Sequence, residues 1–185
     1  MDHTEIDKVL TFWIDEVGPE GWYNSSDELD TLIQREFGGL HALAAGGLLT
    51  SWAASARGSL ALLILLDQFS RNMFRGTADA FAFDLKALTI AKSAIDRGQD
   101  LTIPEPARQF FYLPLEHSES LQDQERAVRL IMMRMPDLTE EGRRAVIGHR
   151  AVIRRFGRFP SRNAALGRLD SDAELAYRAE GGYMS

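Results

Sequence analysis

The sequence predicts an all-α fold, for three reasons. Apolar residues recur at spacings of three and four along most of the 185 residues, which is typical of amphipathic helices. Ser, Thr, Gly and Pro bound these segments at positions where helices begin and end. No segment of useful length alternates polar and apolar residues as a strand would. Helices of this length with short loops predict about eight antiparallel neighbours, stacked as helical hairpins.

The first two helices follow one another near the N-terminus. Thr4 can cap the first helix, and the pair Gly18-Pro19 ends it. Ser25 or Ser26 can begin the second, because acidic residues follow in its first turn and complement the helix dipole. Gly46-Gly47 ends the second helix.

The third and fourth helices complete the first half of the chain. The third, over about 58–74, opens with the run Leu60 to Leu66, which is apolar on every side. A helix that is apolar all round is expected at the centre of the core. Thr77 can cap the fourth helix, which continues through Arg97 and is closed by Gly98.

Two further helices are expected in the middle of the chain. Pro104 opens a short fifth helix that reaches Tyr112, because proline is tolerated in a first turn. The sixth begins at Ser118 or Ser120 and ends near Pro136.

The last two helices are predicted from their capping residues. Thr139 begins one that continues to about Arg155. Ser171 and Glu174 have the spacing of a capping box and begin the other. We expect residues 176–185 to form a mobile tail.

Composition and charge are those of a soluble globular chain and exclude several classes of function. The net charge of −6 argues against nonspecific nucleic-acid binding, which requires a basic surface. The absence of cysteine excludes disulfides, thiolate catalysis and Cys-ligated metals. The N-terminus lacks the pattern of a signal peptide, and the longest apolar run is too short to cross a bilayer. We therefore expect one domain over residues 1–175, in a cytoplasmic protein that does not bind membranes.

Dense clusters of polar residues stand between large apolar residues at three places, residues 67–76, 110–124 and 156–163. Charged and amide groups in such surroundings are costly unless they pair with each other or with a ligand. Only three of the 21 basic residues are lysines. Arginine binds carboxylate and phosphate groups in two-point geometry, although a high-GC codon preference also explains this bias.

In the first cluster, Asp67, Arg71 and Arg75 follow one another at intervals of four residues. If the helix continues that far, they share one face, and Asp67 precedes Arg71 in the favourable order for an ion pair. One interpretation is that Arg71 and Arg75 hold an anionic group while Asp67 orients a guanidinium. The alternative is an ion-pair network that joins helices.

In the second cluster, His117 lies near the carboxylates Glu116 and Glu119, just before a helix N-terminus. Such an imidazole is a candidate general acid or base, or it caps a turn and has a structural role. A metal site that combines His117 with Glu116 or Glu119, Asp67 and His149 is a further alternative. Its spacing matches none of the common ligand motifs, so we expect neither a metal nor a cofactor.

The third cluster carries Arg158 and Arg162 on a rigid turn around Phe159-Pro160. These arginines either complete an anion site with Arg71 and Arg75 or pair with the acidic first half of the chain.

The clusters, together with three further motifs, resemble the bacterial family known as domain of unknown function 924. The resemblance covers nearly the whole chain, with the motifs in the family's order. They are Val9-Leu10-x-Phe12-Trp13, Trp22 with an aromatic after it, Arg35-Glu36-Phe37-Gly38, Leu66-Asp67-Gln68-Phe69-Ser70-Arg71-Asn72, Phe111-Tyr112-Leu113-Pro114 with His117-Ser118-Glu119, and Phe156-Gly157-Arg158-Phe159-Pro160 with Arg162-Asn163.

The resemblance implies an all-α fold similar to a tetratricopeptide-like superhelix, and it carries no established activity, substrate or cofactor. The family commonly shows Pro-His-Arg-Asn where this chain has Pro160-Ser161-Arg162-Asn163. Any role of that family histidine therefore does not extend to Ser161.

Two functions follow from these observations. The first is a convergent, arginine-rich polar site that binds an anionic small molecule, with no reaction assigned. The second is a tetratricopeptide-like scaffold that binds a protein or peptide in its concave groove. The sequence leaves the oligomeric state undetermined. For the first function, the candidate catalytic residues are His117, Glu119 and Asp67, and the candidate ligand-binding residues are Arg71, Asn72, Arg75, Arg158, Arg162 and Asn163.

Overall fold

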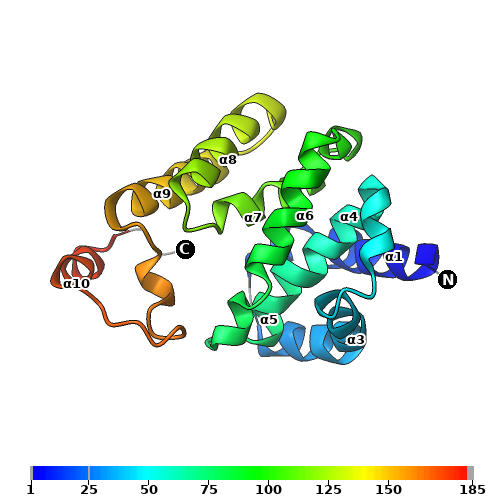
Figure 1. Cartoon of the computed structure of the whole chain (residues 1–185), viewed down its shortest axis with the longest axis horizontal. Helices are drawn as coiled ribbons and strands as arrows, with labels where there is room; N and C mark the ends of the chain where they lie inside the picture. Colours follow the sequence, from blue (N-terminus) through cyan, green and yellow to red (C-terminus); the bar gives the residue numbers. More distant parts are fainter. Residues whose placement is uncertain (1, 25, 183–185) are drawn as a thin grey trace. The chain divides into compact units, whose positions relative to one another are not determined.

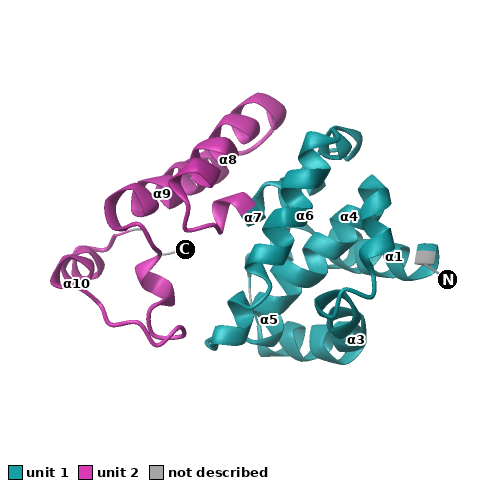
Figure 2. Cartoon of the chain, in the orientation of Figure 1, with its two compact units in different colours: residues 1–114 teal, residues 115–185 magenta. Residues whose placement is uncertain are grey.

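The structure is a computed structural model that describes residues 2–24 and 26–182. Helical segments make up most of these residues, and the described part of the chain contains no strand. The all-α prediction is therefore confirmed. The chain divides into two compact units, residues 1–114 (unit 1) and residues 115–185 (unit 2), coloured separately in Figure 2.

Unit 1 is built from helical segments, several of which continue directly into the next (Figure 1). Segments labelled η are π or 3-10 helices. The elements are α1 (Asp2–Leu10), η1 (Thr11–Val17), α2 (Gly18–Gly21), α3 (Asp27–Ala45), η2 (Thr50–Ala54), α4 (Ala56–Leu63), η3 (Ile64–Phe69), α5 (Ser70–Met73), η4 (Ala78–Phe81), α6 (Asp84–Asp96), η5 (Gln99–Thr102) and η6 (Ala107–Phe111).

Gly18 and Ser26 set helix ends as predicted, but Thr4 does not cap the first helix, because α1 begins at Asp2 and Thr4 lies inside it. The helix formed by α1 and η1 ends at Val17, because Gly18 takes a positive φ of 64° that favours glycine. The Ser26 side chain accepts a hydrogen bond from the backbone N–H of Leu29 and so caps α3. The prediction for Ser25 lies outside the described residues.

The predicted central helix is formed by α4, η3 and α5, which run without a break from Ala56 to Met73. It begins two residues earlier than expected, because Ser55 accepts a hydrogen bond from the N–H of Gly58. Residues 58–70 are all buried. The middle segment, η3, has the wider π-helical turn and carries Asp67.

Aromatic side chains form much of the core of unit 1. Phe69 on the central helix packs against Phe12, Trp13 and Phe37, with ring centroids 5.0–6.1 Å apart. These contacts join α3 and η1 to the central helix. Large buried rings of this kind contribute strongly to core stability.

Two segments of unit 1 differ from the sequence prediction. Thr77 does not cap a long helix: it precedes the short 3-10 turn η4, and α6 begins only at Asp84. Residues 104–112 contain the 3-10 turn η6 in place of an α-helix. Short 3-10 turns suit these connections because they satisfy backbone groups over only a few residues.

Unit 2 contains a helical hairpin followed by a short helix. The α7 segment crosses the boundary between the units along the chain, and α8 and α9 pack side by side (Figure 1). The short loop between α8 and α9 makes them an antiparallel hairpin. The elements are α7 (Leu113–Glu116), α8 (Leu121–Arg134), α9 (Glu140–Phe156), η7 (Pro160–Arg162) and α10 (Asp172–Ala179).

Both caps predicted after α8 are present. The Thr139 side chain accepts from the N–H of Gly142, and Ser171 and Glu174 form the expected capping box. The expected tail begins inside α10, which continues to Ala179, and its last residues, 183–185, lie outside the described residues. Among the helices of the described chain, none has both the length and the hydrophobicity needed to cross a bilayer.

Candidate functional site

The first polar cluster centres on Arg71, which joins α5 to the start of α6. Its two terminal nitrogens bind the two carboxylate oxygens of Asp84 at 3.0 and 3.1 Å. The same guanidinium lies 3.0 Å from the carboxylate of Asp67, one helical turn earlier, and 5.6 Å from the ring centre of Phe81. Asp67 is almost fully buried and also accepts a hydrogen bond from Gln68. The predicted pair of Asp67 and Arg71 is thus present.

Arg75 does not share that helical face, because α5 ends at Met73. It binds Asp30 on α3 with two nitrogens, at 2.8 and 3.0 Å. Asn72 donates to the same carboxylate at 2.8 Å. Burial raises the pKa of Asp30, but the hydrogen bonds from Arg75 and Asn72 outweigh burial and hold it below its ordinary value.

The unit 1 cluster therefore joins helices through the protein's own carboxylates. Arg71 links the central helix to α6, and Arg75 with Asn72 links it to α3. Bidentate pairs of this kind fix the relative position of the elements that carry them. Of the two interpretations of Arg71 and Arg75, this geometry favours an ion-pair network that joins helices over a clamp for an anionic group.

Unit 1 also contains a buried polar pair, His41 and Ser70, that the sequence did not predict. His41 Nε2 lies 2.8 Å from the Ser70 hydroxyl, which itself donates to the carbonyl of Leu66. The imidazole also packs against the rings of Phe74 and Phe83. Burial lowers the pKa of His41, so the ring is neutral at neutral pH. No spacing in the sequence signals this pair, because its members lie 29 positions apart.

In unit 2, the segment that carries His117 is held by two side chains from α8. The Gln124 amide donates to the carbonyls of Glu116 and Ser118, at 2.5 and 2.8 Å, and Asp123 accepts from the Ser118 hydroxyl at 2.9 Å. Gln124 is 1% exposed, so its amide has little access to water. The turn before α8 is therefore fixed from within the core.

Glu119 connects this turn to the third polar cluster. Both of its oxygens bind Arg168, at 2.8 and 2.9 Å, and one also accepts the N–H of Phe159 at 2.8 Å. Burial raises the pKa of Glu119, but these bonds and the nearby charge of Arg162 outweigh burial and hold the pKa below its usual range. Glu119 is therefore ionised at neutral pH and has the geometry of a structural anchor.

Other polar residues of the third cluster also bind carboxylates. Arg158 binds the buried Glu174 with two nitrogens, at 2.7 and 2.8 Å. Asn163 donates to Asp170 at 2.7 Å, and Arg178 pairs with the same carboxylate. Asn163 directly follows η7 and Arg178 lies on α10, so their contacts with Asp170 hold the loop between η7 and α10 from both of its ends.

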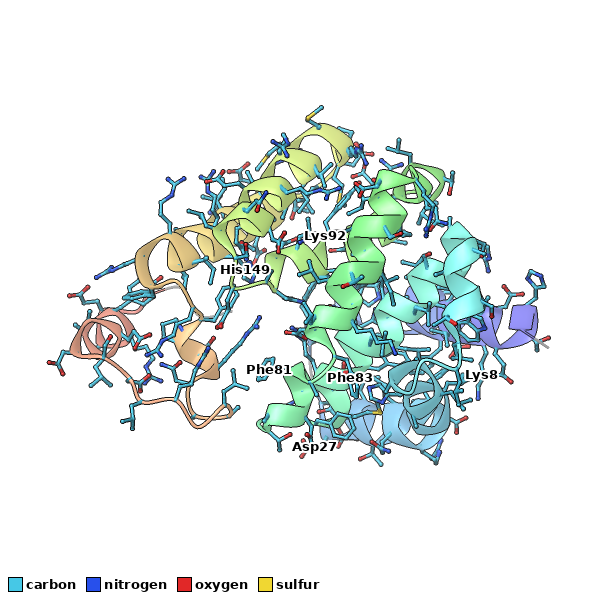
Figure 3. The ribbon with its side chains drawn as sticks, viewed as in Figure 1. Lys8, Asp27, Phe81, Phe83, Lys92 and His149 are labelled. Atoms are coloured by element: carbon cyan, nitrogen blue, oxygen red, sulfur yellow. The ribbon has the colours of Figure 1, made fainter. Side chains whose placement is uncertain are left out.

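A second arrangement in unit 2 surrounds the buried ring of Phe159. The His149 ring packs edge-on against Phe159, with centroids 5.7 Å apart, and the Arg162 guanidinium lies 4.5 Å from the centre of the Phe159 ring. His117 lies near His149, with ring centroids 6.3 Å apart. We call His117, His149, Phe159 and Arg162 the Phe159 cluster; His149 on α9 is labelled in Figure 3.

The orientation of His149 follows from its neighbours. Its Nδ1 lies 3.0 Å from the carbonyl of Ala145 and 3.6 Å from a carboxylate oxygen of Glu116. Because a carbonyl only accepts, Nδ1 carries the proton, and Nε2 is the acceptor atom in the neutral ring. An imidazole held in one tautomer by a backbone carbonyl, with a carboxylate nearby, is an arrangement that general bases and metal ligands use.

The sequence-predicted site residues thus fall into two groups, one in each unit. The structure brings those of unit 1 together around the central helix, and those of unit 2 around Phe159 and Glu119. Convergence of both groups in one site stays a prediction. The groups of predicted site residues are Asp67, Arg71, Asn72 and Arg75 in unit 1, and His117, Glu119, Arg158, Arg162 and Asn163 in unit 2.

In the residues that the structure describes, no three His, Asp or Glu side chains are grouped to hold a metal ion.

Comparison with known proteins gives a family and a similar structure. The family described as "Bacterial protein of unknown function (DUF924)" matches residues 9–182. A solved structure of a protein of unknown function, ATU0120 from Agrobacterium tumefaciens, has 38% sequence identity and a TM-score of 0.92. The match covers 98% of this chain and 100% of that one. A search of curated proteins found no match.

Proposed function

We propose that this chain, which belongs to the bacterial family DUF924, binds a small anionic molecule through the Phe159 cluster of unit 2. The observation that carries the proposal is the position of Phe159. Its ring has the Arg162 guanidinium at 4.5 Å and the His149 imidazole at 5.7 Å. The Phe159 ring therefore contacts both the Arg162 guanidinium and the His149 imidazole. The imidazole of His117 lies beside that of His149.

The chemistry of these groups suits an anion. A guanidinium presents a planar set of N–H donors to carboxylate or phosphate. Protonation of His149 as the anion binds would turn its Nε2 from an acceptor into a second donor. Arg162 and His149 are each 8% exposed, so a bond from either to a ligand is stronger than it would be in water. The proposal names no reaction.

In this proposal, the other expected ligand-binding residues have a supporting role. Arg71, Asn72 and Arg75 hold carboxylates of unit 1, while Arg158 and Asn163 hold those of unit 2. Arg162 is the residue that contacts the ligand.

A thermal-shift titration with phosphate, sulfate, mono- and dicarboxylates and nucleotides, at constant ionic strength, tests the proposal. A ligand at a hundred times its Kd adds about 2.7 kcal/mol to stability. We expect one anion class to raise the Tm of the wild type, and Arg162→Ala to lose that shift. The matched control is Arg144→Ala, because the Arg144 side chain is 75% exposed on α9. An unchanged shift in Arg162→Ala contradicts the proposal.

A second candidate is the peptide-binding scaffold, and an exposed apolar surface on the α8–α9 hairpin supports it. Met132, Met133 and Ile147 are 36%, 74% and 42% exposed. Exposed methionines adapt to varied apolar partners. Peptides selected from a displayed library should lose binding to Met133→Glu and keep it in Leu169→Glu, a control in which the replaced leucine is 90% exposed. Equal binding to both variants excludes this surface.

A further inference from the structure

Unit 1 contains an apolar pocket that none of the polar clusters uses. It lies between the end of α3, η2, the central helix and α6, and its volume is about 510 Å³. This volume is within the range of small-molecule sites. Most of its wall is aliphatic and comes from Ala44, Leu49, Ala53, Leu62, Leu85 and Ile90. Leu85 is 76% exposed, which places it at the mouth of the pocket.

One charged side chain, Lys86, lines this apolar wall among the described residues. Its ammonium donates to the carbonyls of Ala44 and Ala45, at 2.8 and 2.9 Å. These are the last carbonyls of α3, at the negative end of the helix dipole, where a cation is stabilised. An ammonium has three N–H donors, so two carbonyl bonds leave a third for another acceptor.

We propose that this pocket binds a small carboxylic acid with an apolar body, whose carboxylate pairs with Lys86. The aliphatic wall suits a hydrocarbon body, and a single ammonium complements a single negative charge. A phosphate dianion fits less well, because it calls for several donors at once. The site shares no residue with the Phe159 cluster, so the two proposals succeed or fail independently.

A purely structural role for Lys86 makes a different prediction. As a cap on the carbonyls of α3, Lys86 would add stability and have no effect on ligands. Loss of stability in a Lys86 variant is thus expected under both roles. Only the affinity for a carboxylate separates them.

The experiment measures the binding of octanoate and of its neutral analogue octanamide to the full chain by calorimetry. We expect octanoate to bind about tenfold more tightly than octanamide, and Lys86→Met to remove this preference. Lys8→Met is the matched control, because Lys8 lies on α1 and does not line the pocket. It should bind octanoate like the wild type.

A second pair of variants keeps the test valid if Lys86→Met fails to fold. Leu85→Asp places a negative charge at the mouth of the pocket, whereas Leu85→Asn changes the shape equally without the charge. We expect octanoate to bind about tenfold more weakly to Leu85→Asp than to Leu85→Asn. The proposal is overturned if octanoate does not bind, if octanamide binds equally well, or if only peptides with an apolar C-terminal residue occupy the pocket.

Discussion

Arg71 and Asp84 form a two-point ion pair, with both terminal nitrogens of the guanidinium bound to both carboxylate oxygens. The pair joins α5 to the first residue of α6, and the same guanidinium neutralises Asp67 inside the central helix. A single side chain therefore supports two carboxylates, one of which is almost fully buried.

Replacement of Arg71 should be costly. Arg71→Ala removes both ion pairs, and loss of one partner of a buried pair costs about 3–5 kcal/mol. We expect a loss near the lower value, because the Arg71 side chain is 22% exposed. Urea unfolding measures this loss. In the control, Arg57→Ala, the ion pair with Asp7 is well exposed and the loss should be below about 1 kcal/mol. Equal losses in the two variants would contradict this account of Arg71.

Gln124 should also be sensitive to substitution, even by a residue of almost the same size. Gln124→Glu replaces the amide donor with an acceptor that faces the carbonyls of Glu116 and Ser118. Lost and opposed hydrogen bonds of a buried group cost about 1–3 kcal/mol. Gln122→Glu on the same helix is exposed and should unfold like the wild type in urea. A neutral effect of Gln124→Glu would show that the turn before α8 does not depend on this amide.

Two glycine-to-alanine substitutions should have opposite effects on stability. A Cβ on Gly58 would lie 2.0 Å from the carbonyl oxygen of Trp52, so Gly58→Ala must shift the backbone. We expect a loss of about 1–3 kcal/mol. A Cβ on Gly39 meets nothing within 4 Å, and Gly39→Ala should gain about 0.5–1 kcal/mol, because alanine favours the helix. Calorimetric melting shows whether each variant is more or less stable than the wild type. A stabilising Gly58→Ala would contradict the close contact of a Cβ at this position with the carbonyl oxygen of Trp52.

Acid should weaken unit 2 through Glu174. The hydrogen bonds from Arg158, together with those from Ser171, hold the pKa of Glu174 far below its usual range. A carboxyl whose pKa falls on folding stabilises the fold above its unfolded pKa of about 4.3. That contribution is lost as the pH falls through the folded pKa.

The wild-type Tm should therefore fall more steeply below about pH 4 than the Tm of Glu174→Gln, which has no carboxyl to titrate. Glu140→Gln is the control, because the Glu140 side chain is 71% exposed, and it should keep the wild-type slope. Parallel slopes for the wild type and Glu174→Gln would exclude this role of Glu174.

Local chemistry explains which parts of the fold the sequence could predict. Ser26, Thr139 and Ser171 cap helices because each side chain reaches the backbone N–H three residues ahead, and such short-range bonds can be predicted from the sequence. The run Leu60 to Leu66 predicted a buried helix in the same way, because an apolar segment has to leave water. The prediction that Thr77 caps a long helix is wrong, because its hydroxyl donates to the carbonyl of Phe74 instead.

The candidate site depends on contacts that the sequence does not contain. The sequence by itself determined that Asp67, Arg71, Arg162 and their neighbours need partners, because charged groups among apolar residues cannot be left unpaired. Only the tertiary structure decided that Arg71 takes Asp84, that Arg75 takes Asp30 45 positions away, and that Glu119 takes Arg168. An ion pair depends on distance in space, and the packing of helices brings together carboxylates and guanidiniums that the chain order keeps far apart.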